Sequence, residues 1–220
     1  MSILKNKFFK RVYLCSMLYA LCSVMLVACG GYKTPERGAW NTILKGSSFG
    51  AMTETAKMAK KPLYLDAGHK TLQPNETAAY MALLEQELSD TMRKTGIQIT
   101  RIGGDVLVVM IRDAFMERDE AEISEIGAET LGALSRVLFK FDRTFIEIAG
   151  YSDASLDQNA ATRFSFDMAE RVALFMAQHR VKPIRMFVIG RGSARPISDQ
   201  STTGRQMNRR IEIRISPVVK

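Results

Sequence analysis

The feature that most constrains the fold of this chain is a change between two hydrophobic periods over residues 97–216. Residues 119–140 and 158–180 repeat apolar residues at the three- and four-residue spacing of an amphipathic helix. Short apolar runs lie between and after these segments. The last run, Arg209–Ser216, contains Arg-Ile-Glu-Ile-Arg-Ile, the two-residue period of a strand with one buried face. Long helices between short strands are typical of a sheet with helices on one face.

The remaining segments complete this pattern. Gly103-Gly104 separates two apolar runs and predicts a β-hairpin with a two-residue turn. A further helix is expected from residue 76, with Asn75 as its N-cap. We therefore predict an α/β two-layer sandwich of core order β-α-β-α-β-β, with an added N-terminal helix and a tether. The expected strands are 97–102, 105–111, 145–149, 185–189 and 209–216. The expected inward residues are Met81, Leu84, Leu88 and Met92; Ile123, Ile126, Leu131, Leu134, Val137 and Leu138; and Phe164, Met168, Val172, Phe175 and Met176.

The N-terminus has the layout of a bacterial export signal. Residues 1–11 hold four basic residues and no acidic one, and an apolar run follows over Val12–Ala28. The run is shorter than the ~20 residues that a membrane-spanning helix needs. It ends in Leu26-Val27-Ala28-Cys29-Gly30, which resembles a lipobox, so we expect cleavage before Cys29 and lipidation of its thiol. Gly30 in place of Asp favours the outer membrane. The alternatives are an ordinary secretory signal or an uncleaved anchor.

Removal of the predicted signal changes both the number of cysteines and the net charge of the chain. Cys15 and Cys22 lie within it, so only Cys29 remains and no disulfide is expected. The chain has 31 basic and 23 acidic residues, and removing the four basic residues of the signal lowers the net charge from +8 to 27 − 23 = +4. This balance gives no reason to expect a nucleic-acid partner.

The sequence gives no sign of an enzyme. Its two histidines, His69 and His179, belong to no Ser-His-Asp or Cys-His arrangement, and no metal-ligand cluster or phosphate loop is present. We therefore expect no catalytic residues, no metal and no cofactor.

Four blocks in the second half of the chain occur in a recognisable order. They are Gly150-Tyr151-Ser152-Asp153, Phe164–Ala169, Gly190–Pro196 and Gly204–Arg210. Together they resemble the C-terminal domain of the OmpA family, a non-enzymatic module that holds peptidoglycan. The export signal, the segment without periodic pattern, the first predicted helix and this resemblance divide the chain into a signal peptide (1–28), a lipidated tether (29–75), a helical extension (76–96) and an OmpA-like domain (97–220).

The resemblance also implies a binding site. In the family, an Asp of the first block and an Arg of the second hold the ammonium and the carboxylate of diaminopimelate, because a guanidinium matches a carboxylate bidentately. Asp153 is at the first position, but Met168 replaces the Arg, so half of this clamp is missing. Arg163 and Arg171 lie on the same predicted helix and are either partial substitutes or solvated surface charges.

Each remaining candidate has two interpretations. Asp153 is either a ligand residue or a turn residue before the helix. Arg209 and Arg210 either help to hold the site or form structural ion pairs, and Asn208 is either a ligand or a turn residue.

The leading prediction is a lipid-anchored outer-membrane lipoprotein that faces the periplasm and binds the peptide stem of peptidoglycan. The first alternative is a scaffold subunit of an envelope-spanning secretion complex, similar to the DotK-type lipoprotein of type IVB systems, with weakened wall binding and other envelope proteins as partners. The second is a wall-modifying hydrolase, which would need a catalytic constellation that the sequence does not display.

Overall fold

The computed structural model describes residues 70–117 and 122–220 of the chain. The predicted signal peptide, Cys29 and most of the predicted tether lie outside the described residues, as do residues 119–121 of a predicted helix.

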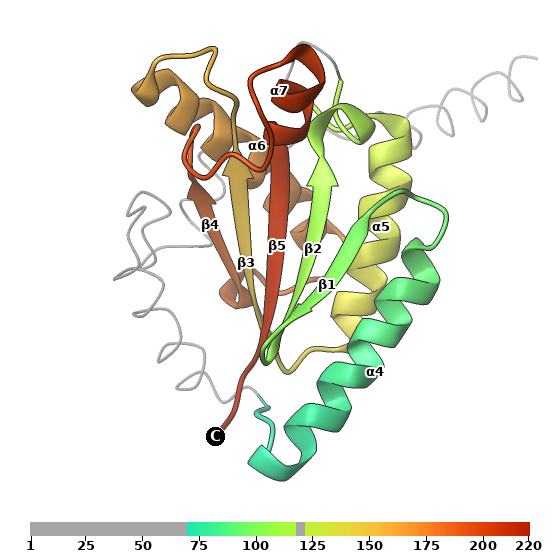
Figure 1. Cartoon of the computed structure of the whole chain (residues 1–220). Helices are drawn as coiled ribbons and strands as arrows, with labels where there is room; N and C mark the ends of the chain where they lie inside the picture. Colours follow the sequence, from blue (N-terminus) through green and yellow to red (C-terminus); the bar gives the residue numbers. More distant parts are fainter. Residues whose placement is uncertain (1–69, 118–121) are drawn as a thin grey trace, which may run out of the picture. The chain divides into compact units, whose positions relative to one another are not determined.

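Five strands form one mixed sheet in the order β1-β2-β5-β3-β4 (Figure 1). β5 is central and antiparallel to both of its neighbours, whereas β3 and β4 are parallel. Strands β2 and β3 therefore point in the same direction, and the residues that follow them meet at one end of the sheet, where β5 begins. The strand bounds are β1 Gln98–Ile102, β2 Asp105–Ile111, β3 Thr144–Tyr151, β4 Met186–Gly190 and β5 Arg210–Pro217.

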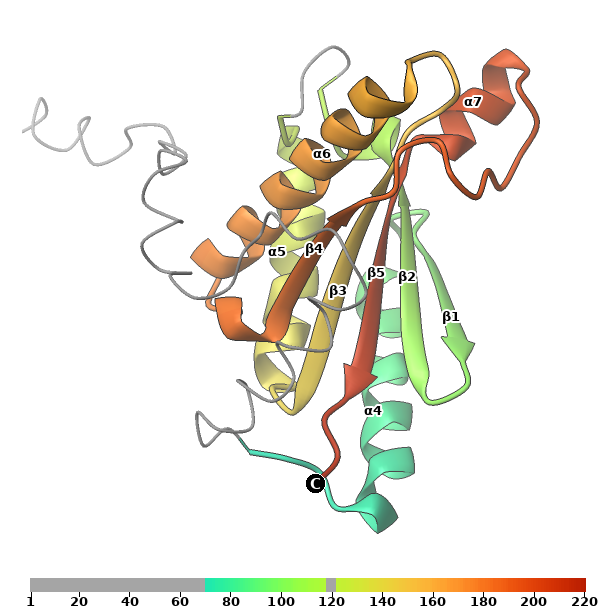
Figure 2. The ribbon, with the colours of Figure 1, turned by 90° about the vertical axis from the view of Figure 1, so that its left-hand side faces the viewer.

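Three long helices cover one face of this sheet, as Figure 2 shows. They are α4 (Pro74–Met92), α5 (Glu125–Lys140) and α6 (Gln158–Gln178). Helix α6 connects the parallel strands β3 and β4 and packs on both of them. The short elements are η1 (Arg112–Ala114), η2 (Pro183–Arg185) and α7 (Thr202–Asn208).

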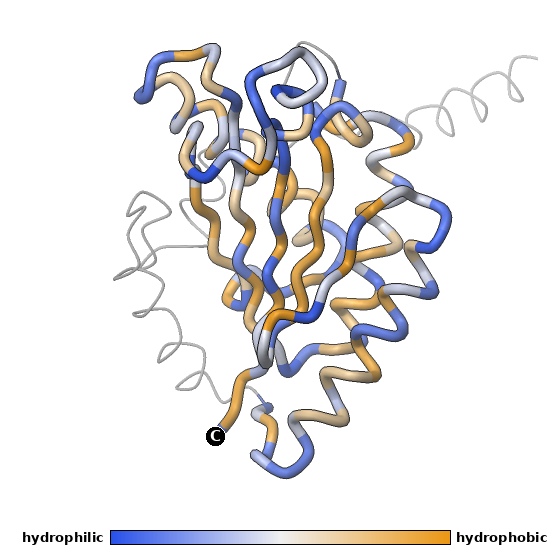
Figure 3. Tube along the Cα trace, viewed as in Figure 1, coloured by the Kyte–Doolittle hydropathy of each residue, from blue (hydrophilic) through white to orange (hydrophobic). Residues whose placement is uncertain are grey.

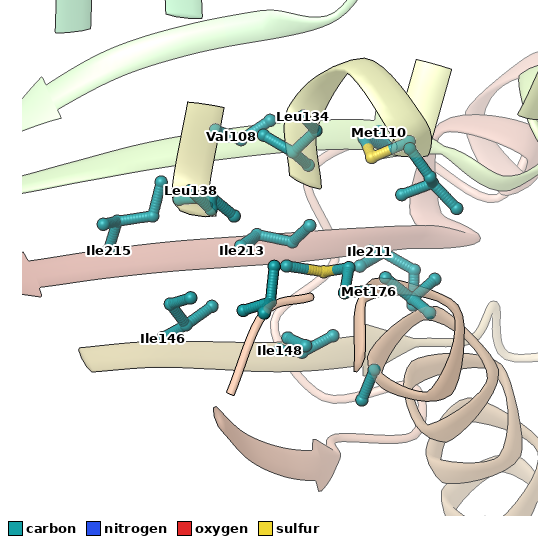
Figure 4. Close-up of a cluster of buried hydrophobic side chains, with 14 of the residues drawn as sticks. Val108, Met110, Leu134, Leu138, Ile146, Ile148, Met176, Ile211, Ile213 and Ile215 are labelled. Atoms are coloured by element: carbon teal, nitrogen blue, oxygen red, sulfur yellow. The ribbon is translucent and has the colours of Figure 1, made fainter. Parts of the chain in front are cut away.

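The main core lies between the sheet and these helices (Figure 4). Alternate residues of the central strands point into it, and in β5 these are three isoleucines that are 0% exposed. Burial of a side chain of this size contributes about 1.5–3 kcal/mol, so the alternation of β5 fixes the face that it buries. Figure 3 shows apolar residues along the central strands and polar residues at the connections above them. The labelled core residues are Val108, Met110, Leu134, Leu138, Ile146, Ile148, Met176, Ile211, Ile213 and Ile215.

The structure confirms the predicted α/β two-layer fold and the order of its long elements. The β1–β2 hairpin turns at Gly103-Gly104, and Gly103 has φ +60°, which glycine adopts without strain. The strand predicted at 185–189 is shifted by one residue, because Arg185 ends the preceding 3₁₀ helix.

Two predicted helix starts are wrong. Helix α4 begins at Pro74 with Gln73 as N-cap, rather than at residue 76 with Asn75 as N-cap, because a proline at the first helical position is preorganised for the helix. Helix α5 begins after Ser124, whose side chain accepts a hydrogen bond from the Gly127 N–H at 3.1 Å. The buried face of its first turn carries Gly127, so the neighbouring Ile126, predicted to be inward, is 70% exposed.

Two further details differ from the prediction. Ile123 lies outside the helix, where it pairs with Met116 in an isolated bridge. Helix α7 was not predicted, because Gly204 lowers the helix propensity of this short segment. The Ser201 side chain caps α7 by accepting from the Gly204 N–H at 3.1 Å.

Candidate functional site

A pocket of about 760 Å³ lies at the end of the sheet where β2 and β3 finish and β5 begins. Four segments that are distant in the sequence contribute to it: the end of β2 with η1, the loop after β3, helix α6, and α7 with the residue after it. Acidic, basic and apolar side chains share its surface. The lining residues are Arg112, Asp113, Met116, Ser152, Asp153, Ser155, Leu156, Phe164, Gln206 and Arg209.

Asp153 is the most buried carboxylate of this pocket, with a relative exposure of 3%. It follows β3, so its position depends on where that strand ends. One oxygen, Oδ1, accepts hydrogen bonds from the backbone N–H of Ser155 at 3.0 Å and from the Ser155 hydroxyl. The other, Oδ2, accepts from Nη1 of Arg209 at 2.7 Å. Asp153 is therefore both a turn residue and one partner of an ion pair in the pocket.

The hydrogen bonds of Asp153 decide its protonation state. Burial opposes ionisation of the carboxyl group, but the hydrogen bonds from Ser155 and Arg209 outweigh burial, so the pKa of Asp153 is below its usual value. Asp153 is thus a carboxylate at neutral pH, which is the state that attracts a cation.

Arg209 lies between α7 and β5, and its side chain is 25% exposed. Besides contacting Asp153, it donates through Nη2 to Oδ2 of Asp113 at 3.1 Å. Burial lowers the pKa of Arg209, but the contacts with Asp153 and Asp113 raise it to a value above the usual one. The guanidinium therefore stays charged, and it is the basic group of the pocket nearest to Asp153.

Sequence analysis missed Arg112 and Asp113 as site residues. They follow β2, and only the parallel arrangement of β2 and β3 brings them to the end of the sheet that holds Asp153. The Arg112 side chain donates through Nη2 to the carbonyl of Glu117 at 2.8 Å, and its guanidinium carbon lies 5.7 Å from the centre of the Phe164 ring. The signal in the sequence was an adjacent pair of opposite charges directly after a buried strand.

The other candidates predicted from the sequence lie elsewhere. Asn208 is 1% exposed; its side-chain oxygen accepts from the N–H groups of Ile197 and Ser198, and its amide donates to the carbonyls of Ser198 and Asp199. It therefore holds the loop before α7 and does not line the pocket.

Arg210 is also outside this pocket. It is 2% exposed, donates through Nε to Glu212 at 2.8 Å, and has its guanidinium carbon 3.8 Å from the centre of the Tyr151 ring. Neither Arg163 nor Arg171 lines the pocket. Of the four residues predicted to bind peptidoglycan, the structure brings together Asp153 and Arg209.

Met168 is fully buried and belongs to the main core. Its side chain packs with the apolar residues between α6 and the sheet and does not line the pocket. The position that carries the family arginine is therefore part of the core in this chain.

Within residues 70–117 and 122–220, no cluster of three or more His, Cys, Asp or Glu side chains is arranged to hold a metal ion. No helix in this part of the chain has the length and apolar character needed to cross a membrane.

The sequence model of the OmpA family matches residues 115–210. The probable lipoprotein YiaD of Escherichia coli is 30% identical over 220 residues, which cover 95% of this chain and 99% of that protein. The chain belongs to the OmpA family. Outer membrane porin F of Pseudomonas fluorescens is 31% identical over 80 residues, which cover 36% of this chain and 24% of the porin.

Solved structures show the same OmpA-like fold. A MotB-like protein from Desulfovibrio vulgaris has a TM-score of 0.58 at 17% identity, over 65% of this chain and 94% of the other. The cell wall anchor of the T6SS from Pseudomonas aeruginosa has a TM-score of 0.55 at 20% identity, over 61% of this chain and 96% of the other.

The two curated relatives are named as a lipoprotein and a porin, and neither name describes an enzyme.

Proposed function

We propose that this OmpA family member is a non-enzymatic lipoprotein of the outer membrane that holds peptidoglycan on its periplasmic side. The observation that carries the proposal is the Asp153–Arg209 pair in an open pocket, with 2.7 Å between Oδ2 and Nη1. A carboxylate and a guanidinium side by side complement a ligand group that has both an ammonium and a carboxylate. The free end of diaminopimelate in the peptide stem has this chemistry.

Membrane attachment is the second part of the proposal. We propose a signal peptide over residues 1–28, lipidation of Cys29 and a tether over 29–75 that leads to the folded part. Alignment with a probable lipoprotein over 95% of this chain supports the anchor, and similarity to an outer-membrane porin supports the membrane. Two or more acyl chains hold a protein stably on a bilayer, at about 0.8 kcal/mol for each buried methylene.

The test is co-sedimentation of the full chain, in detergent, with purified peptidoglycan. Asp153→Asn keeps the size of the side chain and removes its charge. We expect the dissociation constant to rise about ten- to a hundredfold, because hydrogen bonds to charged groups contribute roughly 1.5–3 kcal/mol. Asp105→Asn is the matched control: Asp105 pairs with Arg214 at 3.4 Å and does not line the pocket. If the wild-type chain does not sediment with the wall, the proposal is wrong.

Met168 is the observation that favours a second candidate. Since the family arginine is replaced by a core residue, the domain could serve as a scaffold in an envelope-spanning secretion complex of type IVB, with weak or no wall binding. Pull-down of the lipidated chain separates the two candidates. A wall binder retains peptidoglycan fragments, whereas a scaffold retains stoichiometric protein partners.

A further inference from the structure

The carboxylate of Asp113 lies between two guanidinium groups. Its Oδ1 is 3.3 Å from Nη1 of Arg112, and its Oδ2 is 3.1 Å from Nη2 of Arg209. One carboxylate thus receives a donor on each of its oxygens, from side chains that belong to different elements. This is the arrangement that a carboxylate ligand would adopt between two arginines.

The two guanidiniums are held by other contacts as well. Arg112 donates to the Glu117 carbonyl, and Arg209 donates to Asp153. The backbones are also joined, because the Arg112 N–H donates to the carbonyl of Arg209 at 2.9 Å. The pair of arginines is therefore fixed without Asp113, and a fixed receptor loses little conformational freedom when a ligand binds.

Asp113 itself is held less firmly than its partners. Its side chain is 34% exposed, compared with 5% for that of Arg112. It belongs to η1, a 3₁₀ helix of three residues at the rim of the pocket. Ion pairs with a partly exposed partner contribute little to stability, so a ligand carboxylate can compete with this side chain.

We propose that Arg112 and Arg209 form a carboxylate-binding subsite, and that the Asp113 carboxylate occupies it until a ligand displaces it. Arg112 and Arg209 then supply the cation that Met168 cannot, while the adjacent Asp153 accepts the ligand ammonium. The ligand class is a zwitterionic amino-acid end, and the inference rests on the proposed wall-binding function. Asp113 weakens binding in the wild-type chain, because it competes with the ligand carboxylate.

The test compares two tripeptides that differ in one group. The probes are L-Ala-γ-D-Glu-meso-diaminopimelate and the same peptide with L-Lys, whose side-chain amine has no carboxylate beside it. Binding to the full chain in detergent is measured by calorimetry for the wild type, for Asp113→Ala and for the control Asp105→Ala. We expect Asp113→Ala to bind the diaminopimelate peptide about three- to tenfold more tightly, because two partly exposed ion pairs no longer compete.

The lysine peptide reports on specificity. Its affinity for Asp113→Ala should stay the same or fall, since it has no carboxylate beside its side-chain amine to enter the subsite and the variant has lost a negative charge. Asp105→Ala should match the wild type with both peptides. Adding Arg209→Gln to Asp113→Ala should remove the gain.

The outcomes separate this inference from the proposed function. If the wild type binds the wall and Asp113→Ala shows no gain, or gains equally for both peptides, the inference is wrong and wall binding stands. If only Asp113→Ala binds the diaminopimelate peptide, the inference is supported and wall binding by the wild type is not. If no variant binds either peptide or the wall, both are wrong.

Discussion

Gly150 lets helix α6 approach strand β3 closely, and its replacement tests how the fold positions the site. A Cβ atom at residue 150 would lie 1.8 Å from the carbonyl oxygen of Ser165 and 2.7 Å from its carbonyl carbon. Ordinary contacts begin at 3.4 Å, so α6 would have to move by 3.4 − 1.8 = 1.6 Å. Both sides of this contact are backbone, and no rotamer change can relieve it.

The expected cost of Gly150→Ala follows from this distance. Overpacking a well-packed core costs about 1–3 kcal/mol, and we expect the upper end because the clash is with backbone atoms. Displacement of α6 also shifts the loop that joins it to β3, which contains Asp153. We therefore expect the variant to lose about 3 kcal/mol of unfolding free energy and to bind peptidoglycan more weakly.

The assay is urea unfolding of the full chain, followed by far-ultraviolet circular dichroism, together with wall sedimentation. Gly104→Ala is the matched control, because a Cβ at residue 104 meets no atom within 4 Å. Its unfolding free energy should stay within about 0.5 kcal/mol of the wild-type value. If Gly150→Ala is as stable as Gly104→Ala, the close approach of α6 does not constrain the site as argued.

Two further predictions concern charge and the anchor. Because the folded-state pKa of Asp153 is below its unfolded value of about 3.9, its carboxylate stabilises the fold above that value, and this stability is lost as pH falls through the folded-state pKa. Acid titration by circular dichroism should show a smaller loss of stability below about pH 5 for Asp153→Asn than for the wild type, and equal losses would contradict the contribution of this group. Cys29→Ser should abolish incorporation of labelled palmitate and release the chain from the membrane fraction, whereas labelling that persists would place the acyl group elsewhere.

The layers of the fold could be predicted because they depend on local periodicity. The alternation over Arg210–Ile215 fixes the buried face of β5, and Gly103-Gly104 fixes the hairpin before it. Helix α7 escaped prediction because seven residues that include Gly204 show too little helical pattern. Its stability comes from the Ser201 cap and from contacts with β2 and η1, which belong to a distant part of the sequence.

Arg185 shows another limit of sequence analysis. The sequence places Arg185 at the start of a predicted strand and gives no sign that its charge is buried, yet it is 1% exposed. Its guanidinium donates to the carbonyls of Leu138, Phe141 and Thr144 at 2.8–2.9 Å, and so satisfies backbone groups at and after the end of α5. Free carbonyls at a helix end need such donors, but only the fold shows which side chain provides them.

Two of the four charged residues of the candidate site could likewise be found only from the fold. The family pattern identified Asp153, and the block before β5 identified Arg209. Arg112 and Asp113 belong to no block of the pattern. Their role depends on the sheet order, which sets β2 and β3 in the same direction on either side of β5.

The buried Met168 therefore does not by itself decide whether the pocket binds its ligand. Comparison of motifs alone shows that the family arginine is replaced, and it predicts that the clamp is lost. The pocket nevertheless contains two arginines and two aspartates, joined by ion pairs in the order Arg112–Asp113–Arg209–Asp153. These four charges sum to zero, as do those of an Asp–Arg clamp, so recognition of a neutral zwitterion has to come from their order in space rather than from net attraction. In that order Asp113 is the carboxylate that occupies both arginines. Removal of the Asp113 carboxylate therefore shows whether ligand binding was lost with the family arginine or is provided by Arg112, after β2, together with Arg209.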